Sequence, residues 1–146
     1  MTSPDSIRSA REAGFTLVEL MVVIVIIGLL ATVVMLNVLP SQDRAMVEKA
    51  RADISVLEQA VETYRLEILT FPRTEDGLQA LVSAPRSLDR PERYRNGGYI
   101  RRLPRDPWGN DYHYVFPGRH GAYDVYSLGS DGREGGEGDG ADIGNW

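Results

Sequence analysis

Residues 14–19 read GFTLVE and join a short polar leader to a long apolar run. From Leu20 to Leu36 no residue is charged, and Thr32 is the only one with a polar side chain. As a helix with a rise of ~1.5 Å per residue, residues 15–36 would be about 33 Å long, which is enough to cross a bilayer. The stretch therefore predicts a membrane-spanning helix that begins close to residue 15.

The one ionisable side chain between residues 15 and 36 is Glu19. A charged side chain at the centre of a membrane helix costs roughly 2.5–3.5 kcal/mol. A secretory signal has its small cleavage residue after the apolar core, whereas here Gly14 precedes the core. Cleavage after Gly14 would give Phe15 a free amine, and the amine of a neighbouring chain could neutralise Glu19 in an apolar bundle. The alternative is that Glu19 extends to the lipid headgroups.

The GFTLVE sequence closely resembles the cleavage site of type IV prepilins and pseudopilins. The resemblance implies that a membrane peptidase cuts after Gly14 and methylates the amine of Phe15, and that Glu19 acts in assembly. It implies three parts: a cleaved leader over residues 1–14, a transmembrane and filament-core helix over residues 15–36, and a periplasmic domain over residues 37–146.

Composition excludes several other classes of protein. The chain has 146 residues, a formal net charge of −5 and no cysteine. The acidic balance argues against nucleic-acid binding, which favours a basic surface, and no disulfide can brace the domain. The two histidines and the serines form no recognisable pairing of a nucleophile with a base. We therefore expect a substrate of processing enzymes and not an enzyme.

Apolar periodicity predicts one long helix over residues 15–69. Its second half carries a one-sided stripe of apolar residues spaced three and four apart: Val47, Ala50, Ile54, Leu57, Val61, Tyr64 and Ile68. The stripe predicts packing on the chain's own globular domain, with a coiled coil to another chain as the alternative. Pro40 predicts a kink or a loosened segment near residues 36–40.

A short helix and three strands are expected after the long helix. Thr74 is the predicted N-cap of a helix over residues 75–83. Short strands are expected at residues 99–103, 112–116 and 123–128, and alternating aromatic residues in the last two suit a half-buried antiparallel sheet. The expected fold class is α+β, a long N-terminal helix packed on a small three-stranded sheet.

Longer motifs resemble the major pseudopilin of the bacterial type II secretion system. They are LPRDPWGN at residues 103–110, YSLGSDG at residues 126–132 and ADIGNW at residues 141–146. The resemblance implies a type IV pilin-like fold and a homopolymeric periplasmic filament that drives export of folded proteins across the outer membrane. A type IV pilin of a surface or DNA-uptake fibre is the alternative, although such pilins usually end in a disulfide loop. A monomeric, membrane-anchored calcium-binding module is a third possibility.

The same resemblance implies a location and a set of partners. The chain would lie in the bacterial inner membrane with a single pass and its C-terminal domain in the periplasm. Its partners would be further copies of itself, minor pseudopilins, the prepilin peptidase, an inner-membrane assembly platform with an ATPase, and the secretin channel.

A glycine-rich segment over residues 127–142 carries five carboxylates: Asp131, Glu134, Glu137, Asp139 and Asp142. Oxygen donors on a flexible backbone suit Ca²⁺, and a solvated acidic loop is the alternative. The spacing is not that of an EF-hand. The pseudopilin resemblance implies calcium ligands at the carbonyls of Leu128 and Ser130 and the carboxylates of Asp131, Asp139 and Asp142, with Glu134 in reserve. The ion would brace the tail in place of a disulfide.

Two acidic residues of the long helix, Glu58 and Glu62, lie one turn apart. Arg44 is about 27 Å from Glu62 along a helix, too far for a pair within one chain. If chains stack with an axial offset, the two glutamates could meet Arg44 or Arg101 of neighbours. The alternative is a solvated polar face.

Overall fold

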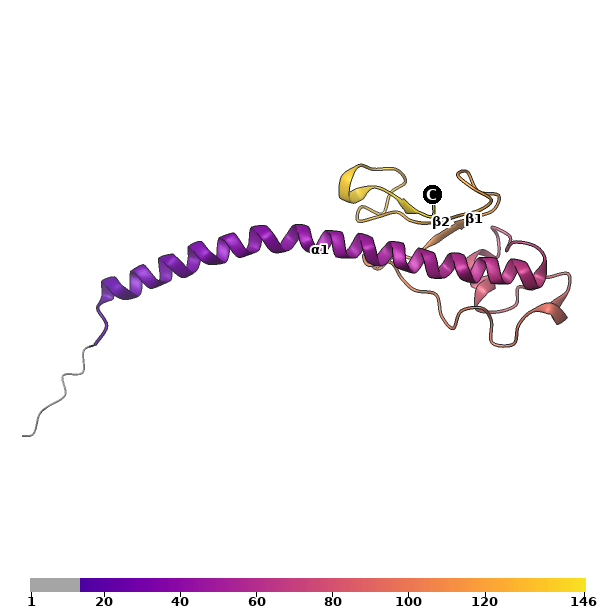
Figure 1. Ribbon diagram of the computed structural model, residues 1–146, viewed down its shortest axis with the longest axis horizontal. Helices are drawn as coiled ribbons and strands as arrows, with labels where there is room; N and C mark the ends of the chain where they lie inside the picture. The colour runs from indigo at the N-terminus through magenta and orange to yellow at the C-terminus, as the bar shows by residue number, and fades with distance from the viewer. Residues whose placement is uncertain (1–13) are drawn as a thin grey trace, which may run out of the picture. The chain divides into compact units, whose positions relative to one another are not determined.

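The computed structural model describes residues 14–146, apart from the side chains of residues 36–41 and of residue 139. Its contacts divide the chain into a unit that ends at Pro40 and a second unit, Ser41–Trp146. The helix α1, Leu17–Ile68, contributes to both units (Figure 1). The prediction of one long helix is thus confirmed. The helix continues through Pro40, so the loosened segment expected there is not found.

The first unit is an apolar helix with no covering from its own chain. Within the described residues, one segment, Leu17–Met35, is long and apolar enough to cross a membrane, with a mean hydropathy of 2.9. All of its side chains are exposed. So much exposed apolar surface needs lipid or other protein chains around it.

The second unit has its core along the apolar stripe of α1. Ala50, Leu57 and Val61 are fully buried. They belong to one cluster with residues from the rest of the unit, among them Leu78, Leu81, Tyr112, Tyr114, Tyr123, Val125 and Ile143. The stripe therefore seats α1 on its own domain, as predicted, and leaves the coiled-coil alternative without support.

Three short strands form one antiparallel sheet in the order β1-β2-β3. They are β1 (His113–Val115), β2 (Asp124–Ser127) and β3 (Ile143–Gly144). Tyr114 is opposite Val125, and Ser127 is opposite Ile143. Figure 1 shows the C-terminal end of the chain beside β2. The predicted strands at residues 112–116 and 123–128 are confirmed in shorter form.

The predicted strand at residues 99–103 is wrong, and β3 takes its place in the sheet. The backbone N–H groups of Tyr99 and Ile100 both donate to the carbonyl oxygen of Leu81, at 2.7 and 3.2 Å. These bonds tie the segment to the end of the 3₁₀ helix η1, Gly77–Leu81, so its N–H groups do not extend a sheet.

Thr74 is not the N-cap of the short helix, which is shorter than the predicted residues 75–83. The Thr74 hydroxyl donates to the Phe116 carbonyl at 2.7 Å and accepts from the Phe116 N–H at 2.9 Å. Its side chain therefore joins the start of this region to the end of β1, across 42 residues of sequence. The helix itself is held by burial of Leu78 and Leu81.

Candidate functional site

Glu19 lies in the first turn of α1 and forms a capping box with Thr16. The backbone N–H of Thr16 donates to Oε2 of Glu19 at 2.9 Å, and the N–H of Glu19 donates to the Thr16 hydroxyl at 3.2 Å. These reciprocal bonds satisfy two N–H groups that a helix start otherwise leaves free. The pattern Thr-x-x-Glu is a sequence signature of a helix start, so the bond was predictable from the sequence but was missed.

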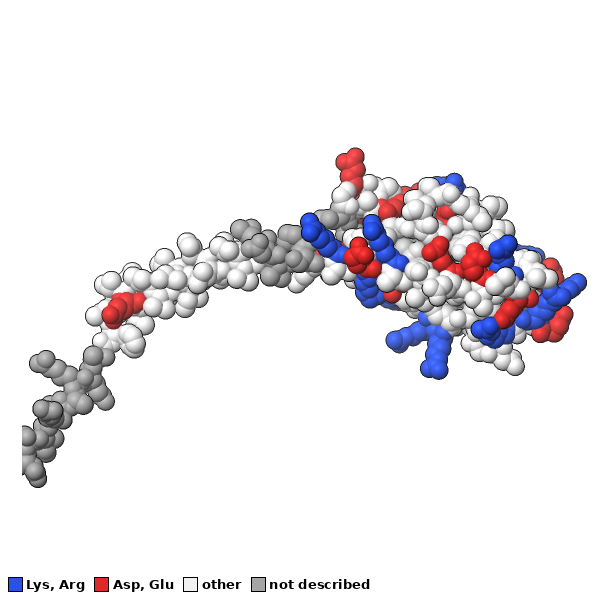
Figure 2. Space-filling model, viewed as in Figure 1, with Lys and Arg blue, Asp and Glu red and all other residues white. Residues whose placement is uncertain are grey.

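The second carboxylate oxygen of Glu19, Oε1, has no hydrogen-bond partner in the part of the chain that the structure describes. Figure 2 shows acidic atoms standing alone near the start of an otherwise uncharged apolar helix. Gly14 and Phe15, the predicted cleavage residues, are exposed and precede the first residue of α1. The site thus combines an accessible peptide bond with a carboxylate that can still accept from a cation outside the chain.

The predicted calcium loop connects β2 to β3, and the pairing of Ser127 with Ile143 closes it at its base. Gly129, in the left-handed region with φ of +67°, lies between the two expected carbonyl ligands, Leu128 and Ser130. A Cβ atom at Gly129 would be 2.7 Å from the carbonyl oxygen of Ala141. Glycine is required where the two arms of the loop come this close.

Two of the predicted carboxylate ligands are held by the backbone of the loop itself. Asp131 Oδ1 accepts from the N–H of Arg133 at 3.0 Å, and Asp142 Oδ2 accepts from the N–H of Gly135 at 2.9 Å. The other oxygen of Asp142, Oδ1, is buried and has no hydrogen-bond partner among the residues that the structure describes. A buried carboxylate oxygen without a donor is unfavourable unless a cation satisfies it.

The side chain of Asp139 lies outside the described residues, and the remaining described side chains include no group of three acidic, histidine or cysteine residues that could hold a metal. Glu134 and Asp142 line one cavity of about 360 Å³. Oxygen-only donors and the orphaned oxygen of Asp142 nevertheless fit Ca²⁺ better than a softer metal.

Asn145 fastens the end of the loop to the core, a role that sequence reasoning missed. Its Oδ1 accepts from the N–H of Val125 at 3.0 Å, and its Nδ2 donates to Oε1 of Glu58 at 3.2 Å. Glu62 pairs with Arg65 at 3.2 Å. Both glutamates, for which pairing with a neighbouring chain and a solvated face were the alternatives, therefore have partners in their own chain.

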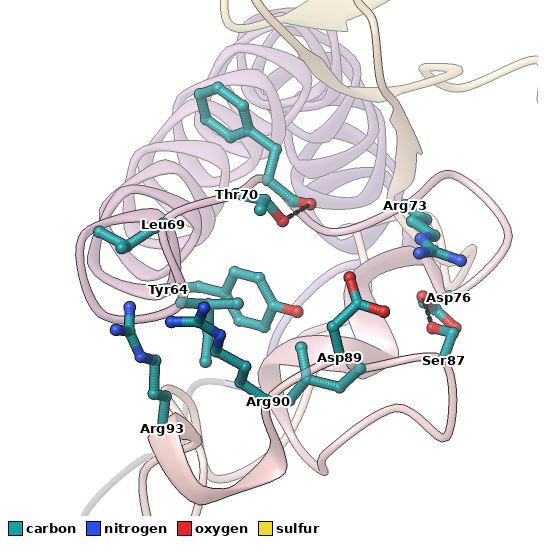
Figure 3. A pocket seen from close by; sticks show the side chains of 12 residues that line it. Tyr64, Leu69, Thr70, Arg73, Asp76, Ser87, Asp89, Arg90 and Arg93 are labelled. Carbon is teal, nitrogen blue, oxygen red and sulfur yellow. Dashed lines mark hydrogen bonds between the residues drawn. The ribbon is translucent and has the colours of Figure 1, made fainter.

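A separate cavity of about 270 Å³ lies at the C-terminal end of α1 (Figure 3). The Ser87 hydroxyl donates to Asp76 Oδ2 at 2.6 Å, and Arg90 and Arg93 also line the cavity. No histidine or cysteine is among the described residues that line it.

Comparisons with known proteins point to a single family. A family model described as "Type II secretion system (T2SS), protein G" matches residues 37–146, and one described as "Prokaryotic N-terminal methylation motif" matches residues 9–35. The type II secretion system core protein G of Vibrio cholerae serotype O1 is 54% identical over 139 residues, which cover 95% of this chain and 94% of that relative. The protein of the same name from Pseudomonas aeruginosa is 46% identical, over 93% of this chain and 96% of its own length.

A solved structure is similar as well. The crystal structure of the major pseudopilin from the type 2 secretion system of enterohaemorrhagic Escherichia coli matches with a TM-score of 0.67 and 44% sequence identity. The match covers 75% of this chain and 94% of that chain. It agrees with the long helix and the small antiparallel sheet described above.

Proposed function

Because the chain belongs to the type II secretion system protein G family, we propose that it is the structural major subunit of a pseudopilus. This periplasmic filament would drive the export of folded proteins across the outer membrane. The observation that carries the proposal is the match of two family models to the two parts of the chain, a methylation motif over residues 9–35 and protein G over residues 37–146. The second match favours a pseudopilin over a pilin of a surface or DNA-uptake fibre.

The precursor would be processed and anchored through its first unit. A prepilin peptidase would remove residues 1–14 by cutting after Gly14, and Phe15 would become the methylated N-terminus. The helix over residues 15–36 would hold the subunit in the inner membrane, with residues 37–146 in the periplasm. The exposed apolar side chains of Leu17–Met35 support this anchor, since they have no cover from their own chain.

Assembly would use the free oxygen of Glu19. Oε2 holds the start of α1 through Thr16, and Oε1 would receive the methylated amine of Phe15 from an adjacent subunit. Such a pair neutralises two charges in an apolar filament core and fixes the axial offset between chains. Transfer of the helix from lipid to the core exchanges one apolar environment for another, so the pairing and packing decide the register.

Calcium would be bound by the loop between β2 and β3. The carbonyls of Leu128 and Ser130 and the carboxylates of Asp131, Asp139 and Asp142 would hold it, with Glu134 nearby. The bound ion would supply a positive charge that satisfies the buried Oδ1 of Asp142 and ties the two arms of the loop together. This role is structural, as is the proposed role of the whole chain.

The proposed partners follow from the filament. They are further copies of the chain, minor pseudopilins, the prepilin peptidase, the inner-membrane platform with its ATPase, and the secretin. The peptidase would act on the bond between Gly14 and Phe15, and neighbouring copies of the chain would contact the apolar helix.

The test uses full-length chains produced in cells that lack their own copy of the gene. We would compare the parent with Glu19→Gln, Glu19→Ala and the exposed control Asp111→Asn. Glu19→Gln keeps an oxygen acceptor for Thr16 but removes the charge. The parent and the control should form filaments, restore secretion and begin at methylated Phe15 by mass spectrometry. Both Glu19 variants should be cleaved and remain in the membrane without filaments.

Three results would count against the proposal, each against a different part. Normal filaments with Glu19→Gln would contradict the proposed ion pair between Glu19 and the amine of Phe15. A mature chain that starts at unmodified Met1 would contradict the proposed cleavage after Gly14. A parent chain that is processed but neither polymerises nor restores secretion would contradict the function itself.

A further inference from the structure

A buried carboxylate, that of Asp106, lies next to the base of the C-terminal loop, and no role described above uses it. Asp106 is 4% exposed and Ser127 is fully buried. The Ser127 hydroxyl donates to Oδ2 of Asp106 at 2.6 Å, while Oδ1 accepts from the N–H groups of Trp108 at 3.1 Å and Asn110 at 2.7 Å. Three hydrogen bonds thus stabilise the anion, and none comes from a cationic side chain.

These bonds fix which way the Ser127 hydroxyl points. An ionised carboxylate can only accept, so the single hydroxyl hydrogen must go to Asp106. The lone pairs of Ser127 Oγ are then free to accept, and the N–H of Gly129 donates to them at 3.2 Å. A continuous chain of hydrogen bonds thus runs from the Asp106 carboxylate through the Ser127 hydroxyl to the backbone N–H of Gly129 in the loop.

Gly129 lies at the position where this chain of hydrogen bonds meets the proposed calcium ligands. Its N–H shares a planar trans peptide with the carbonyl of Leu128, and in such a plane the two groups point in opposite directions. A bond that holds the Gly129 N–H against Ser127 therefore aims the Leu128 carbonyl away from Ser127. At this tight position, where a Cβ would lie 2.7 Å from the Ala141 carbonyl oxygen, the peptide has little freedom to turn.

Asp106 is itself held firmly. Its backbone N–H donates to the carbonyl of Asn110 at 2.8 Å, and its carbonyl accepts from the N–H of Gly109 at 3.0 Å. Arg105 and Asp111 flank this turn and form an isolated β-bridge. The carboxylate is thus presented from a closed turn that lies outside the calcium loop.

We propose that Asp106 is a positioning residue for the calcium site. It orients the Ser127 hydroxyl, which fixes the peptide between Leu128 and Gly129 and so aims the Leu128 carbonyl at the ion. The inference rests on the proposed calcium site, and it adds a residue more than 20 positions away from that loop in the sequence.

Calorimetric titration of calcium into the full-length processed chain in detergent micelles tests this. The variants are Asp106→Asn, Ser127→Ala, the double variant, and Asp111→Asn as a control, since Asp111 loses the same charge from the same turn but has an 86% exposed side chain. Unfolding by denaturant in a chelator measures the stability of each calcium-free form. We expect Asp106→Asn and Ser127→Ala each to raise the Kd for calcium about tenfold or more, as loss of an outer-sphere partner does.

The double variant separates positioning from general stability. Because both residues act along one path, its Kd should be no higher than that of Ser127→Ala alone, and the control should match the parent. Folded Asp106→Asn with the parent's Kd would overturn the inference, as would additive effects in the double variant. If Asp106→Asn does not fold, a parental Kd for Ser127→Ala overturns it. If the parent chain binds no calcium, both the proposed calcium site and this inference are wrong. The proposed filament role is tested separately by the Glu19 variants.

Discussion

The carboxylate of Glu19 has two oxygens with different surroundings. Oε2 closes the capping box with Thr16, and Oε1 is open. The box keeps the carboxylate in the first turn, where the positive end of the helix dipole favours a negative charge. A charge that would otherwise be unfavourable among apolar residues is thus partly stabilised within its own chain.

Buried tyrosines pack much of the second unit. Tyr112, Tyr114 and Tyr123 are each no more than 7% exposed. Burial raises the pKa of all three above the ordinary value, and at Tyr112 the carboxylate of Asp53, which accepts its hydroxyl hydrogen at 2.9 Å, raises that pKa further. Burial also raises the pKa of Tyr99 to about 12. The fold therefore requires these phenols to stay protonated.

We predict that the protein loses stability as the pH rises above about 10, the ordinary tyrosine pKa. Above it the unfolded chain releases protons that the folded chain keeps, so the free energy of unfolding falls by up to ~1.4 kcal/mol per pH unit for each buried tyrosine. Near-ultraviolet absorbance would follow tyrosine ionisation and circular dichroism would follow unfolding. Ionisation of the buried tyrosines and unfolding should occur over the same pH range. Tyr112→Phe should make the free energy of unfolding fall less steeply with pH, by up to the contribution of one tyrosine proton. Ionisation of the buried tyrosines near pH 10 with the fold intact would contradict the prediction.

The end of α1 is built on an unusual backbone conformation. Leu69 is the one residue other than glycine with a positive φ, of +70°, in the described part of the chain. Its N–H donates to the carbonyl of Arg65 at 2.8 Å, a C-terminal cap that usually has glycine at this position. The side chain is 66% exposed, so it gains little from packing.

Replacing Leu69 with glycine should therefore stabilise the second unit. A left-handed conformation costs an L-residue roughly 1–2 kcal/mol, and the greater freedom of unfolded glycine offsets about 0.5–1 kcal/mol of this gain. We expect the free energy of unfolding to rise by about 0.5–1 kcal/mol, measured by chemical denaturation. Leu66→Gly is the matched control: it is 71% exposed but inside the helix, and it should lose about 1 kcal/mol. A loss of similar size at both positions would refute the strain argument.

The elements differ in how far the sequence could predict them. The long helix and its buried stripe were predictable because a period of three and four persists over many turns. Residues 99–103 have the length and composition of a short strand, but the distant carbonyl of Leu81 accepts the N–H groups of Tyr99 and Ile100. The strand β3 has two residues, too few to show any period. Thr74 resembles an N-cap in the local sequence, because its true partner, Phe116, is 42 residues away and cannot be identified from neighbouring residues.

The candidate sites divide in the same manner. The predictions for Glu19 and the cleavage residues rest on a signal that is local and contiguous. The links of Asp106 to Ser127 and of Glu58 to Asn145 could not be predicted, since each joins residues that only the folded chain brings together. The calcium prediction for the carboxylate-rich loop rests on composition, while the predicted backbone ligands came only from the family resemblance.

At the scale of the whole molecule, the two units carry separate tasks. The described part of the first unit presents uncovered apolar surface and one carboxylate, and this surface suits a membrane or apolar contacts with other chains. The second unit buries its core, and its C-terminal loop is closed by the pairing of Ser127 with Ile143, without a disulfide. Calcium should therefore raise the stability of the second unit, and substitution of Glu19 should not change that effect.

This separation leads to a prediction about calcium removal. If the loop binds the ion, free calcium at about a hundred times the Kd should raise the free energy of unfolding by ~2.7 kcal/mol over that in a chelator, measured by chemical denaturation. Magnesium should substitute poorly, because it demands a small octahedral site. Glu19→Ala should keep the full calcium effect, whereas Asp142→Asn should abolish it. In a chelator Asp142→Asn should be at least as stable as the parent, because it removes a buried charge with an unpaired oxygen. Equal stability of the parent with and without calcium would mean that the tail is held by its backbone bonds alone.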